Sequence, residues 1–210
     1  IETSKIIGAE ALIRWIHPEK GFIAPSEFIP LAEENGFIIK LGDWIIDEAL
    51  NQHLDWKNKS IDIAISINIS AKQFLKKDFA ENLIKKIEEK SIIPNKIILE
   101  ITEYILIDNS NKVYSSLKKL HDFGIKISLD DFGTGYSSLS YLRKYPIDYL
   151  KIDKSFVDET YSKNGKIFIE TIVKMGQMLN MKIVAEGVEN SNQVEYLKSI
   201  SCDLYQGYYF

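Results

Sequence analysis

Acidic and amide side chains follow almost every short apolar run in this 210-residue chain, at the point where the run ends. One such residue is usually a strand end that faces water, but its repetition along the chain indicates a shared site. The residues are Glu10, Asn68, Glu100, Asp130, Asp131, Asp153, Glu186, Glu189 and Gln206. Because the strands of a parallel barrel end at one mouth, these side chains are expected to crowd together there.

Carboxylates crowded into one mouth raise each other's pKa and repel, so a cation must compensate them. Sets of oxygen ligands without His or Cys select Mg²⁺ or Mn²⁺, with Ca²⁺ as a competitor. His17, His53 and His121 have no ligand spacing and are expected at the surface. The adjacent acids Asp130 and Asp131 suit the bridging of two ions ~3.5 to 4 Å apart. Two metals predict phosphodiester hydrolysis, because they polarise the phosphoryl oxygen and supply hydroxide near neutral pH.

Lys151 and one acid of this polar set have candidate catalytic roles. Lys151 stands inside an apolar strand, where a cation would stabilise the developing anion or the water network. An ion-paired lysine is the alternative for it. Glu186 precedes Gly187 and is the candidate general base, with a further metal ligand as the alternative role.

The elements that would position these residues alternate along the chain. Short β-branched runs are separated by amphipathic stretches, as in a parallel sheet covered by helices. Strands are predicted over 6–13, 62–69, 96–101, 125–131, 149–153, 182–187 and 202–209. Helices are predicted over 26–36, 38–56, 77–90, 109–124, 137–143, 164–179 and 191–199. This order predicts an α/β fold, a (β/α)8-type (TIM-like) barrel, whose first strand is expected before Ile1.

Composition limits the classes of partner. A net charge of −4 argues against binding to DNA or RNA polymers, which normally requires a basic surface. The single cysteine, Cys202, fits a reducing compartment, so the cytoplasm is expected. No apolar run approaches the ~20 residues of a membrane span, so membrane attachment is expected only through other domains of a parent protein.

Several separated motifs, in the right order, resemble those of EAL domains. Glu10-Ala11-Leu12, followed by Ile13-Arg14-Trp15, resembles the signature that names the family. The segment 130–139, Asp-Asp-Phe-Gly-Thr-Gly-Tyr-Ser-Ser-Leu, matches the family's loop without a departure. The segments 151–156, 184–189 and 206–208 resemble its later motifs.

The resemblance implies a cyclic di-GMP phosphodiesterase that forms linear pGpG with two Mg²⁺ or Mn²⁺ ions and is inhibited by Ca²⁺. It also implies a homodimer. The implied metal ligands are Glu10, Asn68, Glu100, Asp130, Asp131 and Glu186. Glu186 is also the implied base, and Lys151 lies near the catalytic water.

The resemblance assigns supporting roles to four more residues. It implies that Arg14 meets a substrate phosphate, that Leu12 lines the ligand groove and that Gln206 helps to order the site. Glu103 is implied to steady the loop 132–138, which the family connects to dimerisation and activity.

Two alternatives remain open beside catalysis. A cyclic di-GMP receptor without turnover would keep the groove, although members of that kind usually lack part of the metal ring. A barrel enzyme that abstracts a proton beside a carboxylate would need a base such as Lys151 opposite the metals.

The resemblance also bears on the ends of the domain. Family members usually begin about 30 residues earlier and continue past Phe210, so residues 1–210 are expected to form one EAL domain truncated at both ends.

Overall fold

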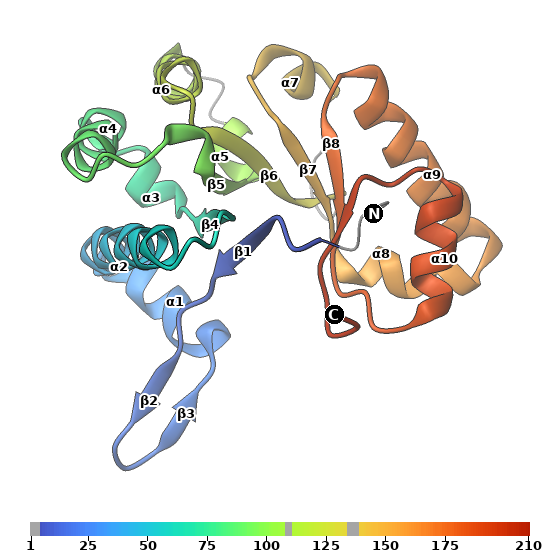
Figure 1. The fold of residues 1–210 in the computed structure, drawn as a ribbon, viewed down its shortest axis with the longest axis horizontal. Coiled ribbons are helices and arrows are strands. Elements are labelled where there is room, and N and C mark those ends of the chain that lie inside the picture. Colours follow the sequence, from blue (N-terminus) through green and yellow to red (C-terminus); the bar gives the residue numbers. More distant parts are fainter. Residues whose placement is uncertain (1–4, 108–110, 134–138) are drawn as a thin grey trace. The chain divides into compact units, whose positions relative to one another are not determined.

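The computed structural model describes residues 5–107, 111–133 and 139–210, with the side chains of 139–141 excepted. These residues form two compact units. The N-terminal unit holds residues 6–101 and 119–125. The C-terminal unit holds the described parts of 1–5, 102–118 and 126–210. Figure 1 shows the helices and strands of these residues, coloured along the sequence.

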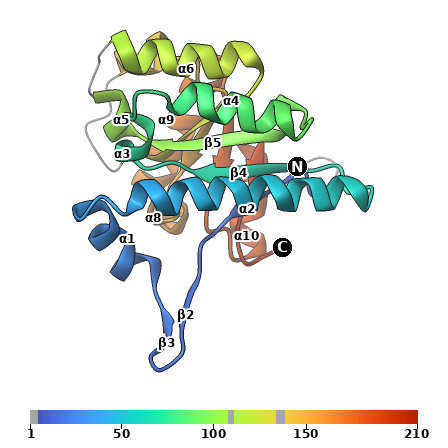
Figure 2. The same cartoon turned by 90° about the vertical axis from the view of Figure 1, so that its left-hand side faces the viewer.

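Three parallel strands build the sheet of the N-terminal unit. β1 (Gly8–Ala11) pairs with β4 (Ala64–Asn68), and β4 pairs with β5 (Ile97–Thr102). Successive side chains point to opposite faces of a strand. The odd-numbered isoleucines and leucine of β4 and β5 are at most 2% exposed, and α2 packs against β4 (Figure 2). The even-numbered residues therefore occupy the other face, where the polar side chains lie.

Four helices accompany this sheet: α1 (Pro25–Glu34), α2 (Ile38–Asn58), α3 (Ala71–Phe74) and α4 (Phe79–Glu89). A short 3₁₀ turn, η1 (Pro94–Lys96), leads into β5. The buried residues of α2 recur every three or four positions, which is the spacing of one face of an amphipathic helix.

A β-hairpin follows β1 and was not expected from the sequence. β2 (Trp15–His17) pairs antiparallel with β3 (Gly21–Ile23), and the hairpin projects from the end of β1 (Figure 1). Trp15 packs edge-on against Phe28 of α1, with 5.5 Å between the ring centroids. Strands of three residues are too short to show a period of two in the sequence.

Four parallel strands lie in the C-terminal unit. β6 (Lys126–Phe132), β7 (Tyr149–Ile152), β8 (Lys182–Ala185) and β9 (Leu204–Tyr205) pair in that order. The apolar residues Leu129, Leu150, Ile152 and Ile183 are at most 1% exposed.

The helices that follow β5 are mostly connections between strands. They are α5 (Glu103–Ile107), α6 (Asn111–Phe123), α7 (Leu139–Lys144), α8 (Lys154–Asp158), α9 (Lys163–Met178) and α10 (Ser191–Ser199), with a 3₁₀ turn, η2 (Glu159–Tyr161), before α9. α9 packs against β7 and β8. Among the described residues, no helix is both long and apolar enough to cross a bilayer.

The seven predicted strands are all present, although most are shorter than expected. The first ends at Ala11 rather than Ile13. The first helix begins at Pro25 after Ala24, not at Ser26, because the side chain of Glu27 accepts a hydrogen bond from the Ala24 N–H. The expectation that His53 lies at the surface is wrong: it lies on the buried face of α2 and is 4% exposed.

Candidate functional site

Glu10 and Asn68 are in direct contact in the N-terminal unit. The Asn68 amide Nδ2 donates a hydrogen bond to Glu10 Oε1 at 2.6 Å. Glu10 is the register partner of Ser66, two residues before Asn68, so both side chains leave the same face of the sheet. Glu100 is the register partner of Asn68 on β5 and shares that face. Three of the predicted metal ligands are thus brought to one face of three neighbouring strands.

β6 carries an irregularity at the two adjacent aspartates. Leu129 pairs with Leu150 and Phe132 pairs with Ile152, so Asp130 and Asp131 together oppose the single residue Lys151. This is a β-bulge, in which one extra residue bends the strand and redirects side chains. Asp131 takes a left-handed conformation with φ 54°, which Asp tolerates better than most residues.

The bulge explains how two consecutive carboxylates can both leave the core. In a regular strand, neighbouring residues point to opposite faces, so one of the two acids would enter the apolar layer. Leu129 and Phe132 are instead both buried, while Asp130 is partly exposed and Asp131 is exposed. The backbone N–H of Asp131 donates to Asp130 Oδ1 at 3.0 Å.

Lys151 joins two of the predicted acids in the C-terminal unit. Its Nζ lies 2.6 Å from Glu186 Oε1 and 3.3 Å from Asp130 Oδ1. The lysine side chain is 3% exposed, against 14% for Asp130 and 18% for Glu186. Burying an ammonium group is costly unless carboxylates compensate it. The three side chains therefore form one charge cluster at the ends of β6, β7 and β8.

Backbone hydrogen bonds fix the position of Glu186 and Gln206. Glu186 N–H donates to the Ile152 carbonyl at 3.0 Å, which extends the pairing of β8 with β7. Gln206 N–H donates to the Ala185 carbonyl at 2.8 Å, and the Gln206 carbonyl accepts from Val188 N–H at 3.0 Å. Gln206 is thus held at both of its backbone groups next to the segment that carries Glu186.

Glu103 lies at the start of α5 and contacts the beginning of the loop after β6. Its Oε1 accepts a hydrogen bond from the Gly133 N–H at 3.1 Å. The remaining loop residues that the sequence singled out, 134–138, lie outside the described residues. The implied part of Glu103 in dimerisation and activity stays a prediction.

Leu12 and Arg14 follow β1, on the segment that leads into the hairpin. Leu12 is 53% exposed, and the guanidinium Nη1 of Arg14 donates to the Ile13 carbonyl at 2.8 Å. This bond uses one of the five guanidinium donors, so others remain that could bind an anion such as a phosphate.

Two other acids of the predicted polar set have local structural partners. Asp153 is the N-cap of α8 and accepts from Ser155 N–H at 3.0 Å. Glu189 pairs with Lys154 Nζ at 2.7 Å. Lys154 was given no role from the sequence, although it lies in the segment 151–156 that resembles an EAL motif.

The donor chemistry of the predicted ligands fits hard divalent ions. Carboxylate and amide oxygens are what Mg²⁺ and Mn²⁺ prefer. Within the described part of the chain, no three His, Cys, Asp or Glu side chains gather closely enough to hold a metal by themselves. Burial raises the pKa of the Cys202 thiol to about 12, so Cys202 stays protonated and is a poor ligand at neutral pH.

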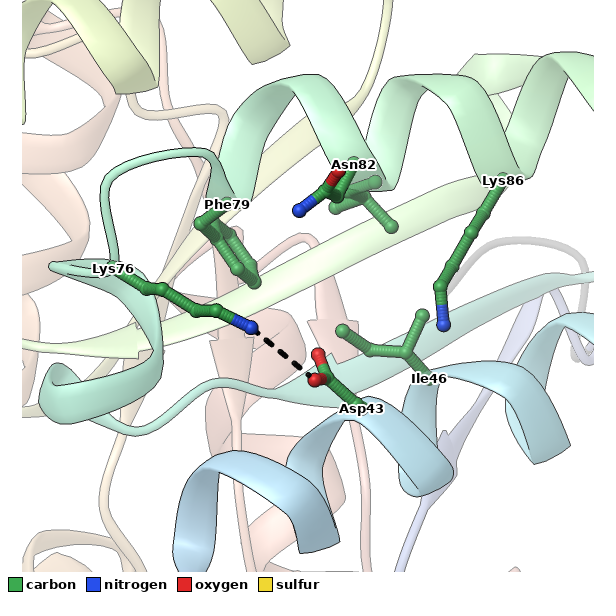
Figure 3. A pocket seen from close by; sticks show the side chains of 7 residues that line it. Asp43, Ile46, Lys76, Phe79, Asn82 and Lys86 are labelled. Carbon is green, nitrogen blue, oxygen red and sulfur yellow. Dashed lines mark ion pairs between the residues drawn. The ribbon is translucent and has the colours of Figure 1, made fainter. Parts of the chain in front are cut away.

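A small pocket lies between α2 and α4 and includes none of the predicted site residues (Figure 3). Ile46, Phe79 and Leu83 give it an apolar lining, and Lys76 pairs with Asp43 across it at 3.5 Å.

Comparison with known proteins identifies the family of the chain. The family model described as "EAL domain" matches residues 1–210. "Signaling protein YkoW" of Bacillus subtilis is 44% identical over all of this chain and 26% of its own length. "Bifunctional diguanylate cyclase/cyclic di-GMP phosphodiesterase MucR" of Pseudomonas aeruginosa is 40% identical over 97% of this chain and 30% of its own. "Cyclic di-GMP phosphodiesterase PdeR" of Escherichia coli is 37% identical over 96% of this chain and 31% of its own. The chain therefore spans about a quarter to a third of these relatives.

Solved structures give the same result. "PaMucR Phosphodiesterase, c-di-GMP complex" matches with a TM-score of 0.92 at 40% identity, over 98% of this chain and 84% of that one. "Structure of EAL Enzyme Bd1971 - cAMP and cyclic-di-GMP bound form" also has a TM-score of 0.92, at 33% identity, over 99% of this chain and 58% of that one. The predicted fold class is confirmed as that of EAL domains, a TIM-like barrel architecture. The chain, which carries Glu10, Lys151 and Glu186 at its strand ends, therefore belongs to the EAL domain family.

Proposed function

We propose that this chain hydrolyses cyclic di-GMP to linear pGpG with the help of Mg²⁺ or Mn²⁺. Relatives at 37 to 40% identity are named as cyclic di-GMP phosphodiesterases, and one structural neighbour is a complex with that nucleotide. The observation that carries the proposal is the buried Lys151 between Asp130 and Glu186. A cation at that depth, next to two acids at strand ends, is arranged for chemistry on a charged substrate.

The residues proposed to hold two metal ions all offer oxygen ligands. They are Glu10, Asn68, Glu100, Asp130, Asp131 and Glu186. When bound, such ions lower the pKa of water and polarise the phosphoryl oxygen that is attacked. Ca²⁺ prefers longer and more numerous oxygen contacts, so we expect it to compete with the smaller ions and to inhibit.

The chain's own groups bind the substrate and move the proton. Glu186 accepts the proton of the attacking water as general base. The ammonium group of Lys151, 2.6 Å from that carboxylate, holds it in place and stabilises the negative charge that develops on the phosphate. Arg14 binds a substrate phosphate through charge-assisted hydrogen bonds, and the exposed side chain of Leu12 contacts the nucleotide.

The wider setting of the domain is also a proposal. We expect a homodimer in the cytoplasm, with any membrane attachment supplied by other parts of the parent protein. The hydrogen bond from Gly133 to Glu103 supports a role for Glu103 in steadying the loop that the family connects to dimerisation. Light scattering of wild type and Glu103→Gln would measure that role.

The proposed function is tested by measuring both the hydrolysis and the binding of cyclic di-GMP. The purified protein is incubated with cyclic di-GMP and Mg²⁺, and the products are separated by chromatography. We expect pGpG, its loss in excess EDTA, and inhibition by Ca²⁺. Binding of cyclic di-GMP without any pGpG would instead identify a receptor module. Full turnover in EDTA would refute the metal mechanism.

A further inference from the structure

The segment that carries Glu186 is anchored at each of its four residues, 186–189. Glu186 N–H donates to Ile152, and Val188 N–H donates to Gln206. The Val188 carbonyl accepts from Tyr209 N–H at 3.0 Å. Glu189 N–H donates to Gln193 Oε1 at 2.8 Å. Among the described residues, no backbone hydrogen bond of Gly187 is found. Gly187 is held instead by contact with a side chain.

That side chain is Lys154, the first residue of α8. Its stem lies against Gly187: a Cβ built on Gly187 would come within 2.6 Å of the Lys154 Cβ, which real Cβ atoms essentially never do. Gly187 also has φ 64°, in the left-handed region that favours glycine. The backbone beside Glu186 thus approaches the lysine as closely as the absence of a side chain permits.

The ammonium group of Lys154 closes the far end of the same segment. Its Nζ lies 2.7 Å from Glu189 Oε1 and 3.2 Å from Asp158, one turn further along α8. The hydrogen bond to Glu189 is the main cause that raises the pKa of Lys154, so this contact favours the charged form of the lysine. One side chain therefore contacts the backbone at Gly187 and the carboxylate at Glu189.

We propose that Lys154 is a positioning residue that holds the 186–189 segment against α8, so that the Glu186 carboxylate stays at its proposed catalytic position. This inference rests on the proposed function of Glu186. Lys151 restrains Glu186 through its carboxylate, and Lys154 restrains it through the backbone. Reacting groups must be held within a fraction of an ångström, because a ~1 Å displacement can cost ~100-fold in rate.

Three substitutions separate the two contacts of Lys154. Lys154→Met keeps most of the stem but loses the charge, and Lys154→Ala loses both. Lys154→Arg keeps both, since arginine also carries an apolar stem and a charged head. The matched control is Lys85→Met, because Lys85 forms a similar exposed pair with Glu89 at 3.7 Å, four residues along α4.

The proposal predicts a specific pattern of kinetics. We expect Lys154→Met to lower kcat by roughly tenfold and Lys154→Ala by more, with KM changed less than about threefold. Lys154→Arg should stay within about twofold of wild type, as should Lys85→Met. The melting temperature should change by no more than about 2 °C in any of them, because exposed ion pairs contribute little to stability.

Hydrogen exchange gives a measurement that does not need turnover. The amide N–H groups of residues 187–190 should exchange faster in Lys154→Met and Lys154→Ala but not in Lys154→Arg. Unchanged kcat and unchanged exchange in Lys154→Ala would overturn the proposal. A fall in kcat that tracks the loss of melting temperature, with no rescue by arginine, would also overturn it and leave Lys154 a structural residue.

Failure of the proposed function would have a different signature. If wild type forms no pGpG, the proposed catalytic role of Glu186 is refuted, whatever results the Lys154 variants give. The exchange experiment would then still show whether Lys154 holds the segment. If wild type turns over normally and the Lys154 variants change neither kcat nor amide exchange, only the positioning role is refuted.

Discussion

Replacing Lys151 by methionine tests how the charge cluster is balanced. Methionine fills a similar volume without the charge, so Lys151→Met removes one partner and leaves the carboxylates of Asp130 and Glu186 close to each other. Those groups are only 14% and 18% exposed. Removing one partner of a buried ion pair typically costs ~3 to 5 kcal/mol, because the remaining charge is left uncompensated.

The expected magnitude lies at the low end of that range. The two acids keep some contact with water, which reduces the penalty, so we take about 3 kcal/mol. For a chain of this size, 1 kcal/mol shifts the melting temperature by ~2 to 4 °C, so the loss is about 6 to 12 °C. Mn²⁺ should restore part of the loss, since it supplies positive charge to the same acids.

Thermal unfolding in EDTA, and then with Mn²⁺, measures both effects. Lys76→Met is the control, because both partners of its pair with Asp43 at 3.5 Å are well exposed, the lysine by 43% and the aspartate by 45%. We expect a loss of about 1 kcal/mol or less for that variant. If Lys151→Met melts within about 1 °C of wild type in EDTA, the cluster does not hold the strand ends together and the reasoning fails.

Four further substitutions test separate parts of the site and the fold. Glu186→Gln should lower kcat by ~100-fold or more while substrate Kd changes by only a few fold, and a normal kcat would place the base elsewhere. Asn68→Ala should weaken Mn²⁺ affinity in a titration, because it removes an oxygen ligand and the 2.6 Å hydrogen bond to Glu10; unaltered affinity would exclude it from the metal site. Arg14→Ala should raise Kd for cyclic di-GMP without altering metal affinity, and an equal Kd would remove Arg14 from the site. Burial, and then the charges of nearby lysines, lowers the pKa of His53 below its usual 6.5. The unfolded chain therefore binds a proton below pH 6.5 that the folded chain does not, and stability falls as pH drops from 6.5 toward the lower folded pKa. His53→Leu should flatten the dependence of unfolding free energy on pH between 5 and 7; an identical slope would show that His53 does not titrate there.

The sequence predicted that the seven parallel strands exist, because most of them are apolar runs between turn signals, but it placed several of their ends wrongly. The strand 96–101 and the observed Ile97–Thr102 differ by one residue at each end. The short helices α3 and α8 were missed because four or five residues are too few to show helical periodicity. Their N-caps, Ser70 and Asp153, were the available signals.

The polar set was predicted from residue types and spacing, and the roles of Leu12, Arg14 and Glu103 from the resemblance to EAL domains, but the sequence did not predict the geometry of these residues. Nothing in the dipeptide Asp130-Asp131 distinguishes a bulge from a regular strand end, since the register depends on pairing with β7. Asp153 was grouped with the polar set because it ends an apolar run, yet it caps α8. A capping carboxylate and a ligand carboxylate look alike in a sequence, and only the nearby backbone N–H groups separate them.

The bulge in β6 has a consequence for how such a protein can vary. Leu129 and Phe132, which flank the two aspartates, both pack in the core. In the pairing with β7, Asp130 and Asp131 therefore occupy the place of one residue. Deleting either acid would shift Phe132 out of its place, whereas replacing Asp131 by asparagine would leave the core layer intact and suit its left-handed backbone. Selection can therefore change the side chain at position 131 without a matching loss of folding, while the length of this strand stays fixed.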